Sequence, residues 1–213
     1  MEPAAARPTL RIDVWSDYVC PFCMLEMPVL DELAAEYGDA LQIAWRAFEL
    51  RPEPEPTLDP DGEYLRTTWA RAVYPMAEAR GLPLRLPPVQ PRSAPVHAAD
   101  YEARRQGRGD AMRRALFSAF FEQGRDIGDV DVLVDIATAA GVDASALRNA
   151  IELGLHADAL RADREDAVEL GIQGVPALLI RRAGDDADQG ILVSGAQPLD
   201  VVRRAIDALS DVA

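Results

Sequence analysis

Cys20 and Cys23 are the residues of this sequence best suited to carry out chemistry. They are the only two cysteines among 213 residues, and Pro21 and Phe22 lie between them. Residues three positions apart on a helix are neighbours, so the two sulfurs can form and break a disulfide with little backbone movement. One pair in a chain of this size is too sparse for a structural disulfide framework. The spacing therefore predicts a redox-active pair.

The place of each cysteine on the expected helix predicts a separate role for it. Pro21 suits the first helical position, because its missing N–H would have no partner there. Cys20 would face free backbone N–H groups and the positive end of the helix dipole, which favour its thiolate. We therefore expect Cys20 to be the more exposed, attacking sulfur. Cys23, more buried, would resolve the mixed disulfide by attacking Cys20.

Two other interpretations of the cysteine pair remain open. Half of a zinc site would need two more ligands, but the only histidines, His97 and His156, lack the spacing of a zinc motif. We therefore expect no metal and interpret both histidines as structural. Free cysteines can also be inert core residues, although a place between a strand and a helix start argues against this.

Two carboxylates flank the pair, Asp17 before it and Glu26 after it. A carboxylate near Cys23 could accept the proton of that thiol during resolution. Either residue could instead cap a helix or face water. Asp17 and Glu26 are therefore candidates for a proton relay, with the structural interpretation kept open.

The segment Gly174-Val175-Pro176 precedes an apolar run near the end of the chain. A proline before a central strand can form a cis peptide bond, which would present backbone groups of Val175 to the cysteines. A trans proline that only begins a strand is equally compatible with the residues. The pattern by itself favours neither form.

The elements that must position the cysteines begin with a β-α-β unit. Alternating apolar residues predict strands at 9–15 and 41–50. A helix from the cysteines to Gly38 lies between them, and Pro28 should kink it. The β-α-β unit is complete by residue 50.

The rest of the chain predicts a long helical block and a β-β-α unit. The pattern is helical from about residue 62 to 171, with a proline-rich linker at 82–95. The expected helices are 62–80, 96–106, 111–123, 131–140, 144–153 and 156–170. The last unit consists of strands at 177–180 and 191–193 and a helix at 198–209.

Composition excludes several classes of partner and chemistry. With 22 Lys and Arg against 36 Asp and Glu, the net charge of −14 would repel nucleic acid or an anionic membrane surface. All basic residues are arginine, which excludes Schiff-base chemistry on lysine. Met1 to Pro8 lacks a cationic segment followed by an apolar run, and no stretch of about 18 apolar residues follows. We therefore expect a soluble cytoplasmic protein.

Several segments carry a resemblance to a known family. In order, they are Val14 to Asp17 with Cys20-Pro21-Phe22-Cys23, Ala47 to Pro52, Ala115 to Gly128, Gly171 to Ala177, and Ser194 to Pro198. Together they resemble the DsbA-like oxidoreductases of the thioredoxin superfamily, and within them the cytoplasmic FrnE-type branch. Because the segments span almost the whole chain, this resemblance is more specific than the cysteine pair alone.

The resemblance implies an α/β, thioredoxin-like fold with a large all-helical insertion. Residues 9–60 and 172–213 would form the two halves of the thioredoxin-like domain, and residues 61–171 the inserted domain. It also implies a cis bond before Pro176 and thiol–disulfide exchange at the two cysteines. The implied substrate-binding surface consists of Pro21, Phe22, Val175 and Pro176.

The dipeptide Pro21-Phe22 departs from the family pattern. The FrnE-type branch usually has Pro-Trp, and the periplasmic oxidases have Pro-His. Without a histidine, one dipole or charge that would stabilise the Cys20 thiolate is missing, so we expect a less oxidising couple than that of DsbA. The residues after Cys23, Met24 to Met27, also differ from those that usually follow the second cysteine in the family. This difference affects the local substrate surface.

The leading hypothesis is disulfide exchange with protein or peptide thiols. The only redox group would be the disulfide itself, with glutathione as a candidate co-substrate and glutathione or a thioredoxin-type protein as reductant. One alternative is a glutathione-dependent isomerase or transferase resembling 2-hydroxychromene-2-carboxylate isomerases and kappa-class transferases, which generally lack the paired cysteines. Another is a redox-independent peptide-binding chaperone. The sequence indicates neither the direction of electron flow nor the oligomeric state.

Overall fold

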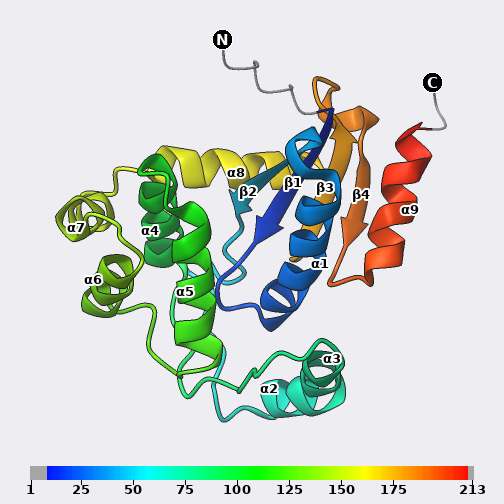
Figure 1. Ribbon diagram of the computed structural model, residues 1–213. Helices are drawn as coiled ribbons and strands as arrows, with labels where there is room; N and C mark the ends of the chain where they lie inside the picture. The colour runs from blue at the N-terminus through cyan, green and yellow to red at the C-terminus, as the bar shows by residue number, and fades with distance from the viewer. Residues whose placement is uncertain (1–8, 211–213) are drawn as a thin grey trace.

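The computed structural model describes residues 9–210, which form a four-stranded sheet with helices on both faces (Figure 1). The strands are β1 (Leu10–Ser16), β2 (Leu41–Ala47), β3 (Ala177–Arg182) and β4 (Ile191–Ser194). Their order across the sheet is β2-β1-β3-β4. β1 is parallel to β2, whereas β3 is antiparallel to both β1 and β4. The expected α/β, thioredoxin-like combination of a β-α-β and a β-β-α half is present.

Apolar side chains cover both faces of the sheet. Ile12 of β1 packs in one layer with helices α1 (Pro21–Tyr37) and α9 (Leu199–Ser210). Trp15 of β1 belongs to a separate buried cluster, in which it packs with helix α8 (Ala157–Glu169). The first four residues of β3 are all buried, which explains the continuous apolar run in this central strand.

The segment between β2 and β3 holds the other α-helices of the described chain. It begins with α2 (Glu63–Thr68), a π-helical turn at 69–73 and α3 (Tyr74–Ala79), which follow one another without a break. It continues through α4 (Ala94–Arg105), α5 (Gly109–Phe121), α6 (Val130–Ala139), α7 (Ala144–Glu152) and α8. Apolar residues of α2 to α7 form one buried cluster with Cys20 and Cys23. The helical block therefore packs directly against the cysteine pair.

Most predicted elements agree with the structure to within two residues at each end. The second strand is an exception: predicted to reach Leu50, it ends at Ala47. The Phe48 N–H still donates to the Ser16 carbonyl at the end of β1, but the Leu50 N–H donates to the buried Asp17 carboxylate instead of to a strand. Helix α1 continues through Pro28, and the kink expected there stays a prediction.

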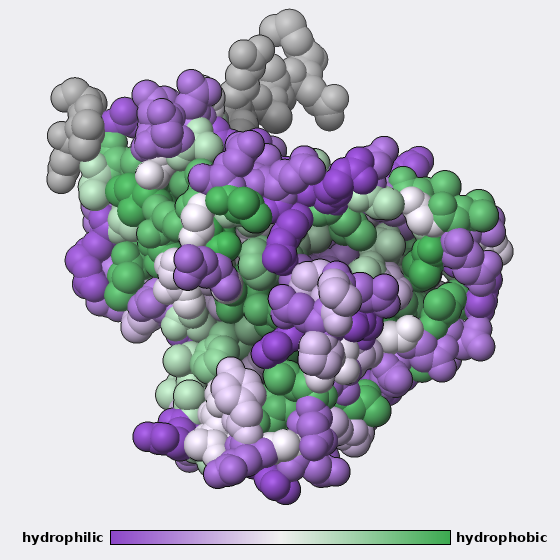
Figure 2. All heavy atoms as spheres, turned by 180° about the vertical axis from the view of Figure 1, so that it is seen from behind, coloured by the Kyte–Doolittle hydropathy of each residue, from purple (hydrophilic) through white to green (hydrophobic). Residues whose placement is uncertain are grey.

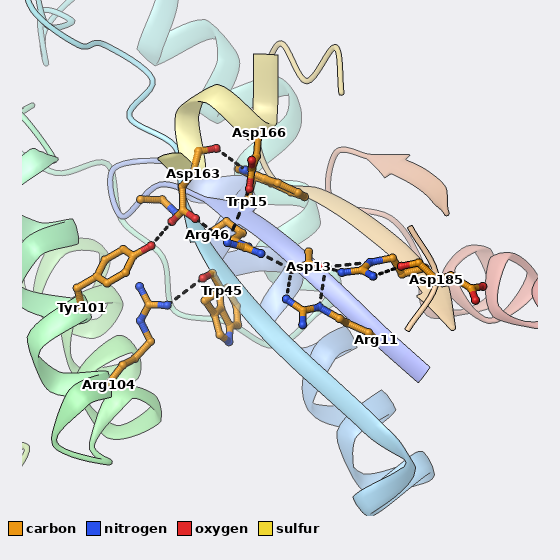
Figure 3. A network of polar contacts seen from close by, with 12 residues as sticks. Arg11, Asp13, Trp15, Trp45, Arg46, Tyr101, Arg104, Asp163, Asp166 and Asp185 are labelled. Atoms are coloured by element: carbon orange, nitrogen blue, oxygen red, sulfur yellow. Dashed lines mark hydrogen bonds and ion pairs between the residues drawn. The ribbon is translucent and has the colours of Figure 1, made fainter. Parts of the chain in front are cut away.

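A buried polar network ties β2 to the helices behind it (Figure 3). The Asp163 side chain of α8 is 1% exposed, and its Oδ1 lies 3.0 Å from Nη1 of Arg46. The same carboxylate accepts hydrogen bonds from the backbone N–H of Ala47 and from the hydroxyl of Tyr101 on α4. Burial, and then the hydrogen bond to Asp163, raise the pKa of Tyr101 to about 12. One carboxylate thus joins a strand to two helices.

The surface of the molecule is mixed in character. Seen from behind, hydrophilic residues dominate the rim, and hydrophobic residues show between them across the middle (Figure 2). Within residues 9–210, no helix is long and apolar enough to cross a membrane. The prediction about a signal sequence at Met1 to Pro8 falls outside the described residues. The domain boundaries at 60 and 171 stay predictions, although each described strand lies outside the segment between them.

Candidate active site

Cys20 lies at the turn where β1 ends and α1 begins. It is the last residue before the helix, and Pro21 follows it in the first helical turn, as predicted. The Cys20 N–H donates to the Asp17 carbonyl at 3.2 Å, and the Cys23 N–H donates to the Cys20 carbonyl at 3.1 Å. This turn sets both cysteines at the amino end of α1, which is the positive end of the helix dipole.

The segment before β3 closes over the Cys20 sulfur. The Val175–Pro176 peptide bond is cis, and the Val175 carbonyl oxygen lies 3.4 Å from Sγ of Cys20, within range of an S–H···O hydrogen bond. The two residues are 155 positions apart in the sequence. They meet because β1 and β3 are antiparallel neighbours in the sheet. The cysteine pair and the Gly174-Val175-Pro176 segment are therefore in contact.

Both cysteines are free thiols, and both are buried. Cys20 is 4% exposed and Cys23 1%. Cys20 is thus the more exposed of the two, as expected, but it is far less accessible than predicted. The reason is the position of Val175 against the Cys20 sulfur. Burial, followed by the neighbouring Cys20, raises the pKa of the Cys23 thiol well above its ordinary value. Cys23 is therefore protonated at neutral pH until it reacts.

A cleft of about 560 Å³ opens at Cys20. Pro21, Phe22 and Val175, three of the four predicted substrate-binding residues, line it, and Pro176 does not. Further lining residues include Trp69 of the helical block and the cationic Arg51 and Arg164. The cleft thus combines apolar walls with positive charge beside a thiol.

Asp17, a predicted relay carboxylate, contacts Cys23 through its backbone. Its N–H points to Sγ of Cys23 at 3.4 Å, an arrangement that stabilises a thiolate on this sulfur. The Asp17 side chain is fully buried and accepts a hydrogen bond from the Leu50 N–H at 2.8 Å. Its Oδ1 lies 3.4 Å from Nε2 of His97 on α4. The structure therefore brings Asp17 and His97 together next to the resolving thiol.

The contact of His97 with Asp17 was not predicted. His97 belongs to the predicted insertion and Asp17 to the first half of the sheet domain, and no local spacing connects them. His156 differs, because its Nε2 lies 3.1 Å from Oε2 of Glu102, a residue of α4. This contact within the helical block fits the structural interpretation of His156.

Among the described residues, the cysteine pair has no partners for a zinc site. No group of three or more His, Cys, Asp or Glu side chains between residues 9 and 210 is arranged to hold a metal ion. A structural zinc needs four ligands. His97 faces Asp17 instead.

Glu26, the second predicted relay carboxylate, has different surroundings from Asp17. Its buried Oε2 lies 3.6 Å from Nη1 of Arg80. Nη2 of Arg80 donates to the Gln197 carbonyl at 2.9 Å, so the pair joins α1 to the end of α3 and to the loop before α9. Burial, opposed by the charge of Arg80, raises the pKa of Glu26 to about 7. Glu26 therefore titrates near neutral pH inside the protein.

Glu26 should make the folded state less stable as the pH rises from about 5 to 8. In this range the unfolded chain, with an ordinary pKa of 4.5, has released the proton, whereas the folded protein holds it up to about 7. Raising the pH through this range therefore favours the unfolded chain. The free energy of unfolding falls by about 3 kcal/mol by pH 8. Glu26→Gln should remove this contribution to the pH dependence of stability. The measurement is the free energy of unfolding in urea at pH 5 and at pH 8, compared between variant and wild type. If the variant loses as much stability between pH 5 and pH 8 as the wild type does, Glu26 is not the group responsible.

Residues 11–207 match the family model described as "DSBA-like thioredoxin domain". The uncharacterized protein YwbO of Bacillus subtilis (strain 168) is 33% identical over 202 residues, which cover 93% of this chain and 96% of YwbO. The crystal structure of the probable DsbA oxidoreductase SCO1869 from Streptomyces coelicolor superimposes with a TM-score of 0.77 and 27% identity, covering 95% of this chain and 90% of that one.

Two further solved structures share the fold at lower identity. The cytosolic disulfide reductase DsbM from Pseudomonas aeruginosa has a TM-score of 0.71 and 22% identity, with 95% of this chain and all of that chain covered. A 2-hydroxychromene-2-carboxylate isomerase has a TM-score of 0.72 and 21% identity, with 95% and 99% covered. The two proteins have different activities, so these likenesses establish the fold alone.

Proposed function

This chain belongs to the family of DSBA-like thioredoxin domains, and from that premise we propose that it is a protein thiol–disulfide oxidoreductase working through Cys20 and Cys23. Cys20 is the nucleophile and Cys23 the resolving thiol. The proposal is carried by the position of Cys20, which lines the cleft and contacts the Val175 carbonyl. A substrate in the cleft meets Cys20 before it can reach Cys23.

The exchange consists of two balanced steps. The Cys20 thiolate attacks one sulfur of a substrate disulfide, forms a mixed disulfide and releases the other substrate sulfur as a thiolate. Cys23 then loses its proton and attacks Sγ of Cys20, so that the intramolecular disulfide forms and the second substrate sulfur leaves. The Asp17 N–H stabilises the attacking Cys23 thiolate. The substrate is reduced and the protein oxidised, and the reverse sequence oxidises a dithiol.

The chemistry of the cleft supports peptide thiols as substrates. Phe22 and Trp69 offer apolar surface, and Arg164, which also lines the cleft, offers a positive charge for a carboxylate. Protein segments and glutathione both carry such groups, and we therefore include glutathione, or a thioredoxin-type protein, as the partner that regenerates the dithiol. The cytosolic disulfide reductase DsbM shares the fold, and by analogy we infer a cytoplasmic location.

Cys23→Ser should convert the protein into a trap for its substrates. Cys20 can still attack, but the mixed disulfide has no neighbouring thiol to resolve it. After incubation with oxidised glutathione, mass spectrometry should show one glutathione per chain, on Cys20, and dithiothreitol should remove it. The wild type should accumulate the intramolecular disulfide instead. A folded Cys23→Ser protein that forms no adduct would remove the basis of the proposal.

A glutathione-dependent isomerase remains the second candidate, because the isomerase neighbour has the same fold. The presence of both cysteines in the chain argues against it. The double variant Cys20→Ser/Cys23→Ser separates the two candidates. Glutathione binding that is equally tight in the double variant and the wild type would favour the isomerase, and loss of the adduct together with loss of disulfide exchange favours the oxidoreductase.

A further inference from the structure

Arg164 of α8 is a cation of the active-site cleft that has no carboxylate partner among residues 9–210. The other arginine that lines the cleft, Arg51, pairs with Glu55, with Nη1 and Oε2 3.9 Å apart. Arg164 instead donates from Nη1 to the backbone carbonyl of Glu49 at 3.0 Å. This bond leaves most N–H donors of the guanidinium for other partners. A substrate in the cleft can therefore supply the missing negative charge.

A short path of contacts leads from Arg164 to the reactive sulfur. Its Cζ lies 4.8 Å from the centre of the Phe48 ring, a cation–π contact that holds the guanidinium at the wall of the cleft. Phe48 and Val175 pack in one apolar cluster, and the Val175 carbonyl lies 3.4 Å from Sγ of Cys20. An extended peptide covers about 3.3–3.6 Å per residue. A substrate cysteine bonded to Cys20 can therefore place a carboxylate at Arg164 within about three residues.

Ser93 adds a second polar group to the cleft. It is 1% exposed, and its hydroxyl has no hydrogen-bond partner within the described chain. Although Ser93 directly precedes α4, its side chain does not cap that helix. The side chain of Glu49 lies at the backbone N–H groups of Ser93 and Ala94, so Glu49 connects Ser93 with Arg164. A buried hydroxyl gains free energy when an acceptor reaches it, which a bound substrate can provide.

The position of Arg164 favours an acidic group despite the negative charge of the whole protein. A net charge of −14 repels an acidic peptide from a distance, but salt screens such repulsion beyond about 8–10 Å. Arg164 is half-buried, and a charge-assisted bond to a carboxylate is stronger there than in open solvent. Arginine keeps its charge at all physiological pH values. The contact therefore distinguishes substrates by their charge and needs no titration.

We propose that Arg164 and Ser93 form a carboxylate-binding subsite beside Cys20, so that the preferred substrates are disulfides of acidic peptides. The acidic residue lies within about three positions of the substrate cysteine. Arg164 forms the charge-assisted contact and determines the specificity, and Ser93 donates a hydrogen bond to the segment bound there. The inference rests on the proposed function, because it names the substrate class of the same cleft.

Four synthetic peptides test the subsite directly. Each is a disulfide-linked dimer with blocked ends, in which a glutamate or a glutamine lies two positions before or two positions after the cysteine. The reduced protein is mixed with each dimer, the reaction is quenched with acid, and the released peptide thiol is measured by chromatography. Glutamine has the size of glutamate without its charge. In at least one of the two positions, we expect the wild type to reduce the glutamate dimer about tenfold faster than the glutamine dimer.

Arg164→Met should abolish this preference. The rate for the preferred glutamate dimer should fall about tenfold, and the rates for the glutamine dimers should stay within twofold of the wild type. Arg164→Lys should restore part of the preference, because it keeps the charge but not the planar fork. Ser93→Ala should lower the rate for the preferred dimer about threefold, through the loss of one hydrogen bond.

Arg161→Met is the matched control. Arg161 also belongs to α8, and its substitution removes the same charge from the protein. It is exposed, lies 2.7 Å from Asp158 and is not part of the cleft lining. This variant should keep the full preference for glutamate. An equal loss in Arg161→Met and Arg164→Met would mean that overall charge decides, which contradicts a subsite at Arg164.

Equal rates for the glutamate and glutamine dimers in both positions would overturn the proposal, even if Arg164→Met does not fold. Oxidised glutathione, which also carries carboxylates, serves as a fifth substrate. If Arg164→Met slows its reduction but the wild type shows no preference among the peptides, the subsite serves glutathione and the assignment to acidic peptides is wrong. A wild type that reduces none of the five disulfides would instead contradict the proposed function itself.

Discussion

Cys20→Ser should lower the rate of disulfide exchange by roughly a thousandfold or more, as expected when the nucleophile of an enzyme is removed. A serine hydroxyl is not ionised at neutral pH and cannot form a mixed disulfide, so the first step is lost. A hydroxyl can still donate a hydrogen bond to the Val175 carbonyl, so the fold should be kept. The measurement is the glutathione-driven reduction of insulin, followed by turbidity.

The Cys20→Ser result also separates the enzymatic interpretation from a binding one. If this variant reduces insulin at the wild-type rate, Cys20 is not the nucleophile. If it loses exchange but suppresses the aggregation of an unfolded protein as well as the wild type does, the peptide-binding hypothesis gains support. Equal unfolding midpoints of variant and wild type in urea serve as the control for folding.

Asp163→Ala should destabilise the folded protein by about 2–4 kcal/mol, because it leaves two backbone and side-chain donors unpaired at about 1–3 kcal/mol each. The substitution removes the 3.0 Å contact of Arg46 with Asp163, although Arg46 keeps its 3.1 Å pair with Asp13. It also leaves the Ala47 N–H and the Tyr101 hydroxyl without their acceptor, and unpaired buried donors are costly. Urea unfolding at pH 7 should show a lower midpoint with an unchanged slope.

Glu165→Ala is the matched control for Asp163→Ala. Glu165 also belongs to α8 and also faces an arginine, with Oε1 3.9 Å from Nε of Arg161, but both side chains are exposed. Exposed pairs of this kind contribute between about 0 and 1 kcal/mol. Similar unfolding midpoints for the two variants would mean that the Asp163 network does not support the fold.

The fold was predictable because its signals are local. Alternating residues in β1, the proline after Cys20 and the glycines that follow several helices each act over a few positions. Together they place the element ends to within two residues, except at β2. That strand ends at Ala47 because its partner β1 ends at Ser16, and the Leu50 N–H donates to the Asp17 carboxylate instead. Asp17 and Leu50 are 33 positions apart, so no local pattern reveals this contact.

The surroundings of the cysteines were less predictable, because they depend on tertiary contacts. The spacing of Cys20 and Cys23 identifies the pair, but the burial of Cys20 comes from Val175, at the far end of the chain. The contact of His97 with Asp17 needs the helical block to fold back onto the cysteine turn. Periodicity predicts that α4 is a helix, but it does not say which residue α4 presents to which loop.

Val175, whose carbonyl lies against the Cys20 sulfur, is also the last part of the active site to be synthesised. Val175 follows Cys20 by 155 residues, so a ribosome that adds about 5–20 residues per second needs about 8–30 s to reach it. β1 waits equally long for its partner β3, and such distant pairings form slowly. During that interval the nascent chain exposes both thiols to the redox buffer of the cell. The compartment therefore sets the oxidation state that the cysteine pair carries into the folded protein.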